Sequence, residues 1–300
     1  MRKLLSQTCF FLYHVAMEHT MVQSNFHTHC GLDDGSGAME EYVLRALSLG
    51  FNTLGFSCHT PCELNDDWHM KRSDLDYYLS EIHRLQDVYG DRIEIHSGLE
   101  LEYLEDTKEL VGMEFSGMVD YTIASMHLMR HKASGTYLSV DGPIAEFETL
   151  LADNFHGDAQ AYVAAYFQME EELMERHRFD LLGHCDLIKK RNTDNKYFNP
   201  QEAWYQRLAT HMLKIAKKQK VRIEVNTGGI ARGATIETYP SMEMIRECAN
   251  LGITLTLSSD AHQSTHLDFY FAQATDLLIQ AGYRTLDTLR HGLWQAAPIK

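Results

Sequence analysis

Short apolar runs alternate along the chain with longer segments in which apolar residues recur at helical spacing. Seven of the runs have the length and the apolar or β-branched content of buried strands, and they cover residues 21–26, 53–59, 92–99, 120–126, 179–182, 221–225 and 253–257. Gly50, Gly90 and Gly252 stand where helical segments stop. Strands that alternate with helices predict a parallel α/β protein.

The segments between these runs predict the helices. We expect helices at 39–49, 74–89, 144–152, 159–178, 200–219, 241–250, 267–281 and 286–296, with a short helix at 109–115 and a small strand at 136–140. No Pro-rich, Ser-rich or charged linker divides the pattern, and no internal repeat is visible. We therefore expect one domain over residues 21–300, preceded by an N-terminal extension over residues 1–20.

Imidazole, carboxylate or amide side chains follow the C-terminal ends of all seven runs. In chain order they are His27 and His29, His59, Glu100, His127, His184, Asn226, and Asp260 with His262. In an open doubly wound sheet functional residues gather at one switch point, whereas the strand ends of a closed barrel all meet at one mouth. The distribution therefore predicts a single TIM-like barrel with its site at the C-terminal ends of the strands.

These side chains are of the types that bind metal ions. Residues i and i+2 of a strand point to the same face, so His27 and His29 can reach one ion. The expected ligand set is His27, His29, Asp34, His59, Glu100, His127, His184, Asp260 and His262. Nine groups exceed the four to six or so ligands that one zinc, manganese or iron ion takes, so we expect two to three divalent ions with a bridging carboxylate. Asp33 competes with Asp34 for its place in the set.

A multinuclear site with nitrogen and oxygen ligands suits hydrolysis of phosphate esters. The ions lower the pKa of a bound water, so that metal-bound hydroxide attacks phosphorus, and they neutralise developing charge. Phosphate also needs cations, and the candidates on loops leaving the mouth are Lys189, Lys190, Arg191 and Arg232. Arg232 is the preferred one, because a guanidinium binds phosphate in a bidentate manner. No G-x-S-x-G motif accompanies a serine, which disfavours a covalent serine mechanism.

Charge, apolar runs and cysteine content limit the kinds of partner and the cellular compartment that we expect for this protein. A net charge of −15 argues against nucleic acid, which needs clustered Lys and Arg, and leaves a small phosphorylated metabolite as the expected partner. No run reaches the roughly 18 apolar residues that a membrane span requires. The six cysteines form no C-x-x-C pair, which indicates reduced thiols and a cytoplasmic protein. A homo-oligomer is compatible with all of these features.

The ordered motifs carry a family resemblance. They are His27-Thr28-His29, Asp33-Asp34-Gly35, Ser57-Cys58-His59, Gly98-Leu99-Glu100, Ser125-Met126-His127, Gly183-His184-Cys185-Asp186 and Ser259-Asp260-Ala261-His262. Together they resemble the motif series of the PHP (polymerase and histidinol phosphatase) family, in order and over about residues 24–266. Within that family, residues 33–35 with the helix that follows them, residues 55–61 and residues 186–190 are most similar to the monofunctional histidinol-phosphate phosphatases.

The resemblance implies a distorted (β/α)7 barrel with three ions. By analogy the first ion would be held by His27, His29, Glu100 and Asp260, and Glu100 would bridge to a second ion held by His127 and His184. Asp34, His59 and His262 would hold the third. The residues expected to be catalytic as well are Glu100, Asp260 and His262.

The resemblance also implies a reaction, the hydrolysis of L-histidinol phosphate to L-histidinol and phosphate in histidine biosynthesis. Asp67, Trp68 and His69 are candidates for binding the imidazole of such a substrate. Two alternatives stay open. One is a phosphatase of the same type that acts on a nucleotide, a sugar phosphate or phosphotyrosine, and the other is a non-catalytic metal-binding barrel.

Overall fold

Seven parallel strands form the centre of the molecule. The computed structural model describes residues 24–62, 64 and 67–299, so the expected N-terminal extension lies outside the described residues. The strands are hydrogen-bonded in the order β1 (Ser24–Asn25), β2 (Thr53–Phe56), β3 (Glu94–Leu104), β5 (Tyr121–Ser125), β8 (Leu181–Leu182), β9 (Arg222–Asn226) and β10 (Leu255–Ser258). Every neighbouring pair is parallel, as the alternating pattern predicts.

The sheet nearly closes on itself between its first and last strands. The backbone amide of His29 donates to the carbonyl of Ala261 at 3.0 Å, and the amide of Ala261 donates to the carbonyl of His27 at 3.2 Å. These bonds join the ends of β1 and β10 just beyond the strands themselves. Closure brings the C-terminal ends of all seven strands to one mouth. The predicted distorted, seven-stranded TIM-like barrel is confirmed.

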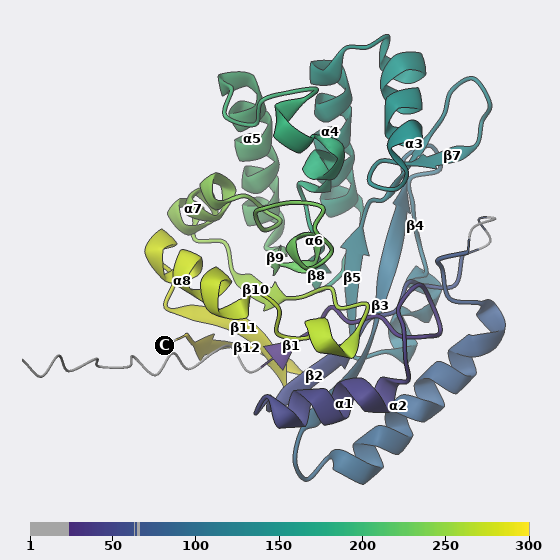
Figure 1. Cartoon of the computed structure of the whole chain (residues 1–300), viewed down its shortest axis with the longest axis vertical. Helices are drawn as coiled ribbons and strands as arrows, with labels where there is room; N and C mark the ends of the chain where they lie inside the picture. Colours follow the sequence, from purple (N-terminus) through teal and green to yellow (C-terminus); the bar gives the residue numbers. More distant parts are fainter. Residues whose placement is uncertain (1–23, 63, 65–66, 300) are drawn as a thin grey trace, which may run out of the picture.

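Helices surround the barrel (Figure 1). They are α1 (Met39–Ser48), α2 (Leu75–Tyr89), α3 (Ile144–Thr149), α4 (Ala159–Arg176), α5 (Ala203–Gln219), α6 (Gly228–Ala231), α7 (Met242–Leu251) and α8 (Phe271–Ala281). Short helical segments lie in the connections, namely η1 (Arg72–Asp74), η2 (Met113–Met118), the π-helical η3 (Leu150–Asn154), η4 (Leu187–Arg191), η5 (Thr193–Asn195) and η6 (Ser264–His266).

Helix α7 illustrates how local sequence sets these elements. The Ser241 hydroxyl caps its first turn by accepting from the amide of Met244. Met244, Ile245 and Cys248 recur at helical spacing and are buried against the barrel. Gly252 then adopts a φ of 65°, a left-handed conformation that ends the helix.

Three antiparallel additions extend the barrel. Strand β4 (Glu109–Val111) pairs with β3, β6 (Leu128–Arg130) pairs with β7 (Tyr137–Ser139), and β11 (Thr285–Arg290) pairs with β12 (Leu293–Pro298). The small strand expected at 136–140 is therefore present. The short helix expected at 109–115 is wrong, because β3 runs on past the barrel to Leu104 and offers an edge on which Leu110 becomes buried.

The final helix expected at 286–296 is also wrong. Leu286, Leu289 and Leu293 mimic helical spacing, but His291 and Gly292 both adopt positive φ and form a two-residue hairpin turn. Leu289 is 1% exposed and packs in the cluster Phe26, Tyr121, Ile123, Leu181 and Leu289. Burial of that side chain in a second apolar cluster, together with the turn, outweighs helical periodicity here.

Tyr121 ties the first two strands together inside the barrel. Its hydroxyl donates to the carbonyls of Phe26 at 2.7 Å and Phe56 at 3.0 Å. A Cβ atom at Gly55 or Gly98 would overlap the Tyr121 side chain, so glycine is required at both positions for this close approach. The chain segments that carry the ligand-type residues after β1 and β2 are thereby held in a fixed relation.

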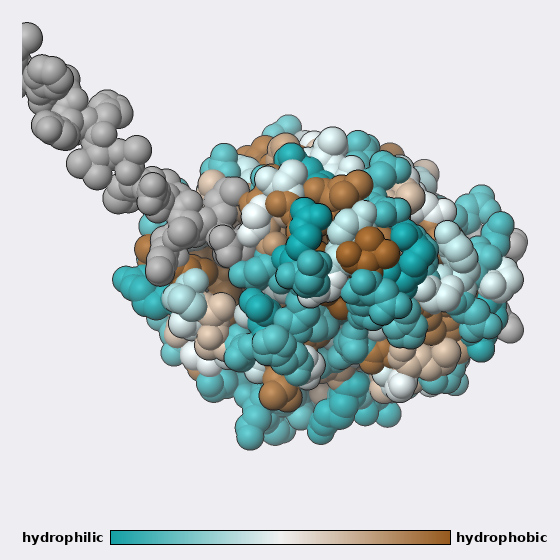
Figure 2. Space-filling model, turned by 90° about the horizontal axis from the view of Figure 1, so that it is seen from below, coloured by the Kyte–Doolittle hydropathy of each residue, from teal (hydrophilic) through white to brown (hydrophobic). Residues whose placement is uncertain are grey.

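The surface is mainly hydrophilic on the face seen from below, where hydrophobic side chains form only small separate groups (Figure 2). Among the described residues, no helix combines the length and the apolar character that a membrane crossing needs.

Candidate metal centre

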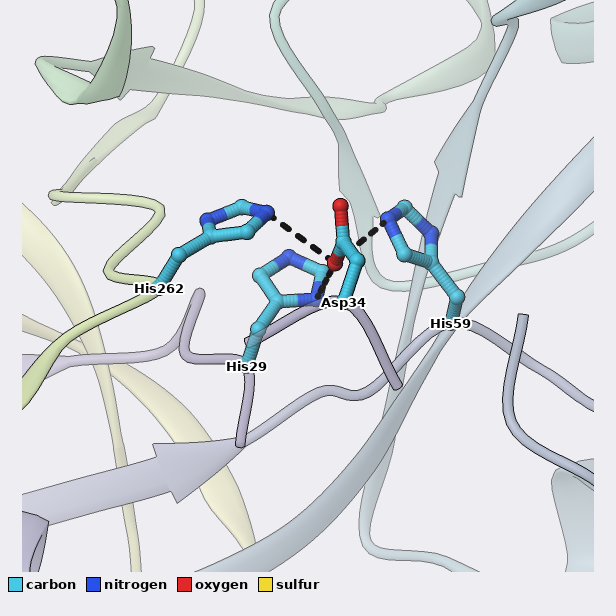
Figure 3. A group of neighbouring side chains, drawn as sticks. All are labelled: His29, Asp34, His59 and His262. Carbon is cyan, nitrogen blue, oxygen red and sulfur yellow. Dashed lines mark ion pairs between the residues drawn. The ribbon is translucent and has the colours of Figure 1, made fainter. Parts of the chain in front are cut away.

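Asp34 lies among three imidazoles at the barrel mouth (Figure 3). Its Oδ1 atom is 3.1 Å from Nε2 of His262, 3.7 Å from Nε2 of His59 and 3.8 Å from Nδ1 of His29. The four side chains come from the first loop and from the ends of β1, β2 and β10, so only barrel closure brings them together. One ligand atom from each lies within 4.8 Å of the others, a spacing that one cation can span.

Glu100 lies at the centre of the ligand-type residues and is 2% exposed. Both of its carboxylate oxygens face imidazole nitrogens at 3.1 to 3.5 Å, and these belong to His27, His29, His59, His127 and His184. The Ser125 hydroxyl donates to Oε1 at 2.6 Å and orients the carboxylate. A carboxylate with one oxygen toward each of two histidine groups has the arrangement expected of a bridging ligand.

Asp260 completes the cluster from the end of β10. Its Oδ1 atom is 3.3 Å from Nε2 of His29 and 3.7 Å from Nε2 of His27, while Oδ2 accepts from Arg232 at 2.8 Å. The backbone of Asp260 has a φ of 49°, a left-handed conformation that is uncommon for a residue with a side chain. The guanidinium of Arg232 thus holds a strained residue at the mouth.

The cluster contains buried polar atoms that have no hydrogen-bond partner within the described part of the chain. They are Nε2 of His27, Nε2 of His29 and Oε2 of Glu100, and all three converge on the same space. Unpartnered buried polar atoms are costly, and cations would satisfy these three at once. The overlapping groups with metal-ligand spacing are His29, Asp34, His59, His262; His27, His29, Asp260; His27, Glu100, His184; and His59, Glu100, His127. The residues therefore fit divalent ions.

A second layer of carboxylates orients the imidazoles. Asp33, Glu102 and Glu224 each lie 2.6 to 2.7 Å from the Nδ1 atom of one histidine, namely His29, His127 and His27. Such contacts fix the ring and direct Nε2 inward toward a metal. Asp33 also accepts the backbone amide of His59 at 2.9 Å, so it belongs to this outer layer, while Asp34 faces the cluster.

Sequence reasoning missed Glu102 and Glu224. Glu102 stands two residues after Glu100 on β3, and Glu224 stands two residues before Asn226 on β9. Residues two apart on a strand share a face, so this alternation was the signal available in the sequence.

The electrostatics keep the central carboxylate ionised. Burial by itself raises the pKa of Glu100, but the neighbouring imidazoles of His27, His59 and His127 hold that pKa well below its usual range. Burial lowers the pKa of His59 to about 3. For His127, burial is outweighed by the carboxylates of Glu102 and Glu100, which raise its pKa to about 10. Glu100 therefore carries the ionised carboxylate that a metal ligand needs.

A pocket of about 840 Å³ opens over the cluster. It is lined by some, but not all, of the four candidate phosphate-binding cations. Lys190, Arg191 and Arg232 line the pocket. Lys189 does not, because its ammonium group is buried between Asp186 at 2.8 Å and Glu237 at 3.0 Å.

Of the three lining cations, Lys190 is paired with Asp141 at 2.6 Å and Arg232 with Asp260. Arg191 has no carboxylate partner among the described residues, and its Nε atom is buried without a hydrogen bond. Of the three imidazole-binding candidates, Trp68 lines the pocket, with its ring 4.7 Å from that of His59. His69 stacks on Trp68 at 3.7 Å, and Asp67 is not part of the lining.

Comparison with known proteins agrees with this geometry. Residues 24–228 match the PHP domain. The chain belongs to the PHP domain family. It is 31% identical, over 90% of its length and 97% of the relative, to a Deinococcus radiodurans protein named probable histidinol-phosphatase. It is 22% identical to the histidinol-phosphatase of Bacillus subtilis, over 82% of this chain and 95% of that one. The family resemblance seen in the motifs is confirmed.

Solved structures share the fold. A histidinol phosphate phosphatase from Lactococcus lactis, solved with zinc, L-histidinol and phosphate, superimposes with a TM-score of 0.67 at 19% identity and covers 91% of this chain and 98% of its own. A Listeria monocytogenes protein superimposes with a TM-score of 0.73 at 21% identity, over 83% of this chain and 99% of its own. These similarities establish the barrel architecture of the PHP domain chain.

Proposed function

We propose that this PHP domain protein is a metal-dependent phosphomonoesterase that hydrolyses L-histidinol phosphate to L-histidinol and phosphate. The observation that carries the proposal is that the described residues leave Nε2 of His27, Nε2 of His29 and Oε2 of Glu100 without hydrogen-bond partners. Glu100 lines a pocket that also presents Arg191, a cation with no carboxylate partner among those residues. Cation-binding atoms and an anion-binding group in one pocket suit a phosphate ester. The histidinol-phosphatase relatives support the choice of substrate.

The ions would be two or three divalent cations, for which zinc, manganese and iron are the candidates. His27, His29 and Asp260 would hold one, and Glu100 would be shared with a second held by His127 and His184. Asp34, His59 and His262 would hold a third. Such ions supply Lewis-acid stabilisation of phosphoryl oxygens and lower the pKa of water.

The side chains of this protein then perform the binding and the positioning. Asp33, Glu102 and Glu224 fix the imidazole rings through Nδ1. Arg191 binds the phosphate, while Arg232 holds the carboxylate of Asp260 in place. Glu100, Asp260 and His262 all line the pocket, and we assign them catalytic roles in addition to metal binding. Trp68 forms an aromatic wall suited to the imidazole of histidinol phosphate.

We also propose a cytoplasmic setting. The buried cysteines Cys30, Cys58, Cys185 and Cys248 form no disulfide with any described residue, as expected of a protein in a reducing compartment.

A substrate profile tests the proposal. The full chain, loaded separately with zinc, manganese and iron, is assayed for phosphate release from L-histidinol phosphate, nucleotide monophosphates, sugar phosphates and phosphotyrosine, and its metal content is measured. We expect at least two ions per chain and a kcat/KM for histidinol phosphate that exceeds the others at least about 100-fold. Rapid nucleotide hydrolysis beside negligible histidinol phosphate turnover would overturn the substrate. Fewer than two ions together with no turnover would favour a non-catalytic barrel.

A further inference from the structure

One wall of the pocket does not come from the barrel. It is formed by the β6–β7 hairpin, the loop that follows it and the start of α3, and its lining residues are Thr136, Tyr137, Ser139, Asp141, Pro143 and Glu146. Strand β7 and helix α3 lie side by side at the edge of the molecule (Figure 1). The metal cluster makes no use of this wall, so the wall can contact the part of a substrate that lies away from the metal ions.

The carboxylates that line the pocket differ in what already neutralises them. Asp34, Glu100 and Asp260 belong to the metal cluster. Asp141 is paired with the ammonium group of Lys190 at 2.6 Å. Among the described residues Glu146 forms no ion pair with a lysine, an arginine or a histidine, and it is the only pocket-lining carboxylate there of which this is true.

Glu146 is also held in place. Its Oε2 atom accepts the backbone amide of Ser139 at 2.6 Å, which ties the start of α3 to the end of β7. Its Oε1 atom has no hydrogen-bond partner among the described residues. The side chain is half-buried, so it presents a positioned negative charge to the pocket. A preorganised charge of this kind binds a cation without the entropy cost of ordering a flexible side chain.

Arg191 is the positive counterpart of Glu146. Both side chains line the same pocket, and neither is neutralised by a neighbour within the described part of the chain. A ligand that carries one anionic and one cationic group would pair with both. L-Histidinol phosphate is such a molecule, since its phosphate ester oxygen and its primary ammonium group are on adjacent carbons.

We propose that Glu146 binds the ammonium group of the substrate, and that the pocket selects phosphomonoesters of amino alcohols over phosphoesters without an amine. This inference rests on the proposed function. Arg191 takes the phosphate end and Glu146 the amine end. Glu146 is a specificity residue, because it contacts the part of the substrate that does not react.

The test compares L-histidinol phosphate with its desamino analogue, 3-(imidazol-4-yl)propyl phosphate, in the metal-loaded full chain and in Glu146→Gln. The variant keeps an oxygen that can accept from Ser139, so the wall stays in place while the charge is lost. We expect KM for histidinol phosphate to rise about 10- to 100-fold, the range for a lost hydrogen bond to a charged group, with KM for the analogue unchanged. Glu146→Asp, which keeps the charge, should retain part of the preference.

The control is Glu148→Gln on the same helix, whose exposed side chain pairs with Lys196 and is absent from the pocket lining. It should leave both substrates unaffected. Equal loss on both substrates in Glu146→Gln, or no loss on either, would overturn the role of Glu146 while leaving the proposed function intact. A parent protein that does not hydrolyse histidinol phosphate would instead overturn the proposed function, and the inference with it.

Discussion

The carboxylate of Asp33 lies 2.6 Å from Nδ1 of His29. The same side chain accepts the backbone amides of Cys30 and His59, so one buried group sets the position of the first two ligand-bearing strand ends. Asp34, its neighbour in the chain, points into the cluster instead. Two adjacent aspartates thus have different tasks, one in orienting a ligand and one as a ligand candidate.

Asp33→Asn should weaken metal binding without removing a ligand. The amide cannot supply the carboxylate oxygens that orient His29 and the loop, so we expect metal affinity and turnover to fall about 10- to 100-fold. Metal retained after dialysis against graded chelator, together with kcat, measures the effect. Asp87→Asn, an exposed site on α2, is the control. Metal retention and turnover equal to those of the parent would contradict the orienting role.

Glu100→Gln should cost far more activity than stability. The amide oxygen can still accept from Ser125, but the charge shared by five imidazoles is lost. We expect kcat/KM to fall by about 1000-fold or more, roughly 4 kcal/mol of transition-state stabilisation, with fewer ions bound per chain. Kinetics, metal analysis and thermal unfolding of the metal-free protein separate these effects. Unaltered turnover would refute a bridging role.

Removing Arg191 should impair substrate binding, whereas removing Lys189 should impair the stability of the fold. Arg191→Ala removes a cation that pairs with no carboxylate of residues 24–62, 64 or 67–299, so we expect KM for the phosphate ester to rise about 10- to 100-fold with little change in the free energy of unfolding. Lys189→Ala leaves the buried carboxylate of Asp186 without its cation, which should cost about 3–5 kcal/mol of stability. Urea unfolding and steady-state kinetics on both variants give the comparison. A higher KM in Lys189→Ala at unchanged stability would return the phosphate role to Lys189.

Glu170 should make the protein less stable as the pH rises. Burial on α4 raises its pKa to about 8, although the Tyr166 hydroxyl bonded to it and the charge of His127 lower it. Between its ordinary value of 4.5 and 8, the folded protein therefore holds a proton that the unfolded chain releases, so stability falls with pH in that window.

Glu170→Gln removes this dependence. Relative to the parent, the variant should gain nothing near pH 4.5 and roughly 2–5 kcal/mol near pH 8. Urea unfolding at both pH values in the presence of chelator gives the difference, with the exposed Glu175→Gln on the same helix as control. An equal increment at both pH values would show that Glu170 is ionised in the folded state.

Much of the site was predictable because its residues follow strand ends. His27, His29 and Asp34 follow β1, Glu100 lies on β3 near the mouth, and His59, His127, His184, Asp260 and His262 follow other strands, so the barrel itself brings them together. The outer carboxylates were harder to predict, since Glu102 and Glu224 sit within apolar strands, where nothing local separates a positioning role from burial beside a charge. The hairpin at 285–298 escaped prediction because Leu286 and Leu289 satisfy helical spacing as well as they satisfy a hairpin.

The sequence by itself determined the parallel α/β barrel and the ligand-type residues at its mouth, because both follow from local periodicity and from strand order. Only the tertiary structure decided which of two nearby residues of the same charge has which role. It placed Asp33 against Nδ1 of His29 and Asp34 within the cluster beside His262. It also buried Lys189 against Asp186 while leaving Arg191 in the pocket. The physical reason is that adjacent side chains in turns share the same local pattern, and their roles depend on which distant charges and cavities the fold brings beside each one.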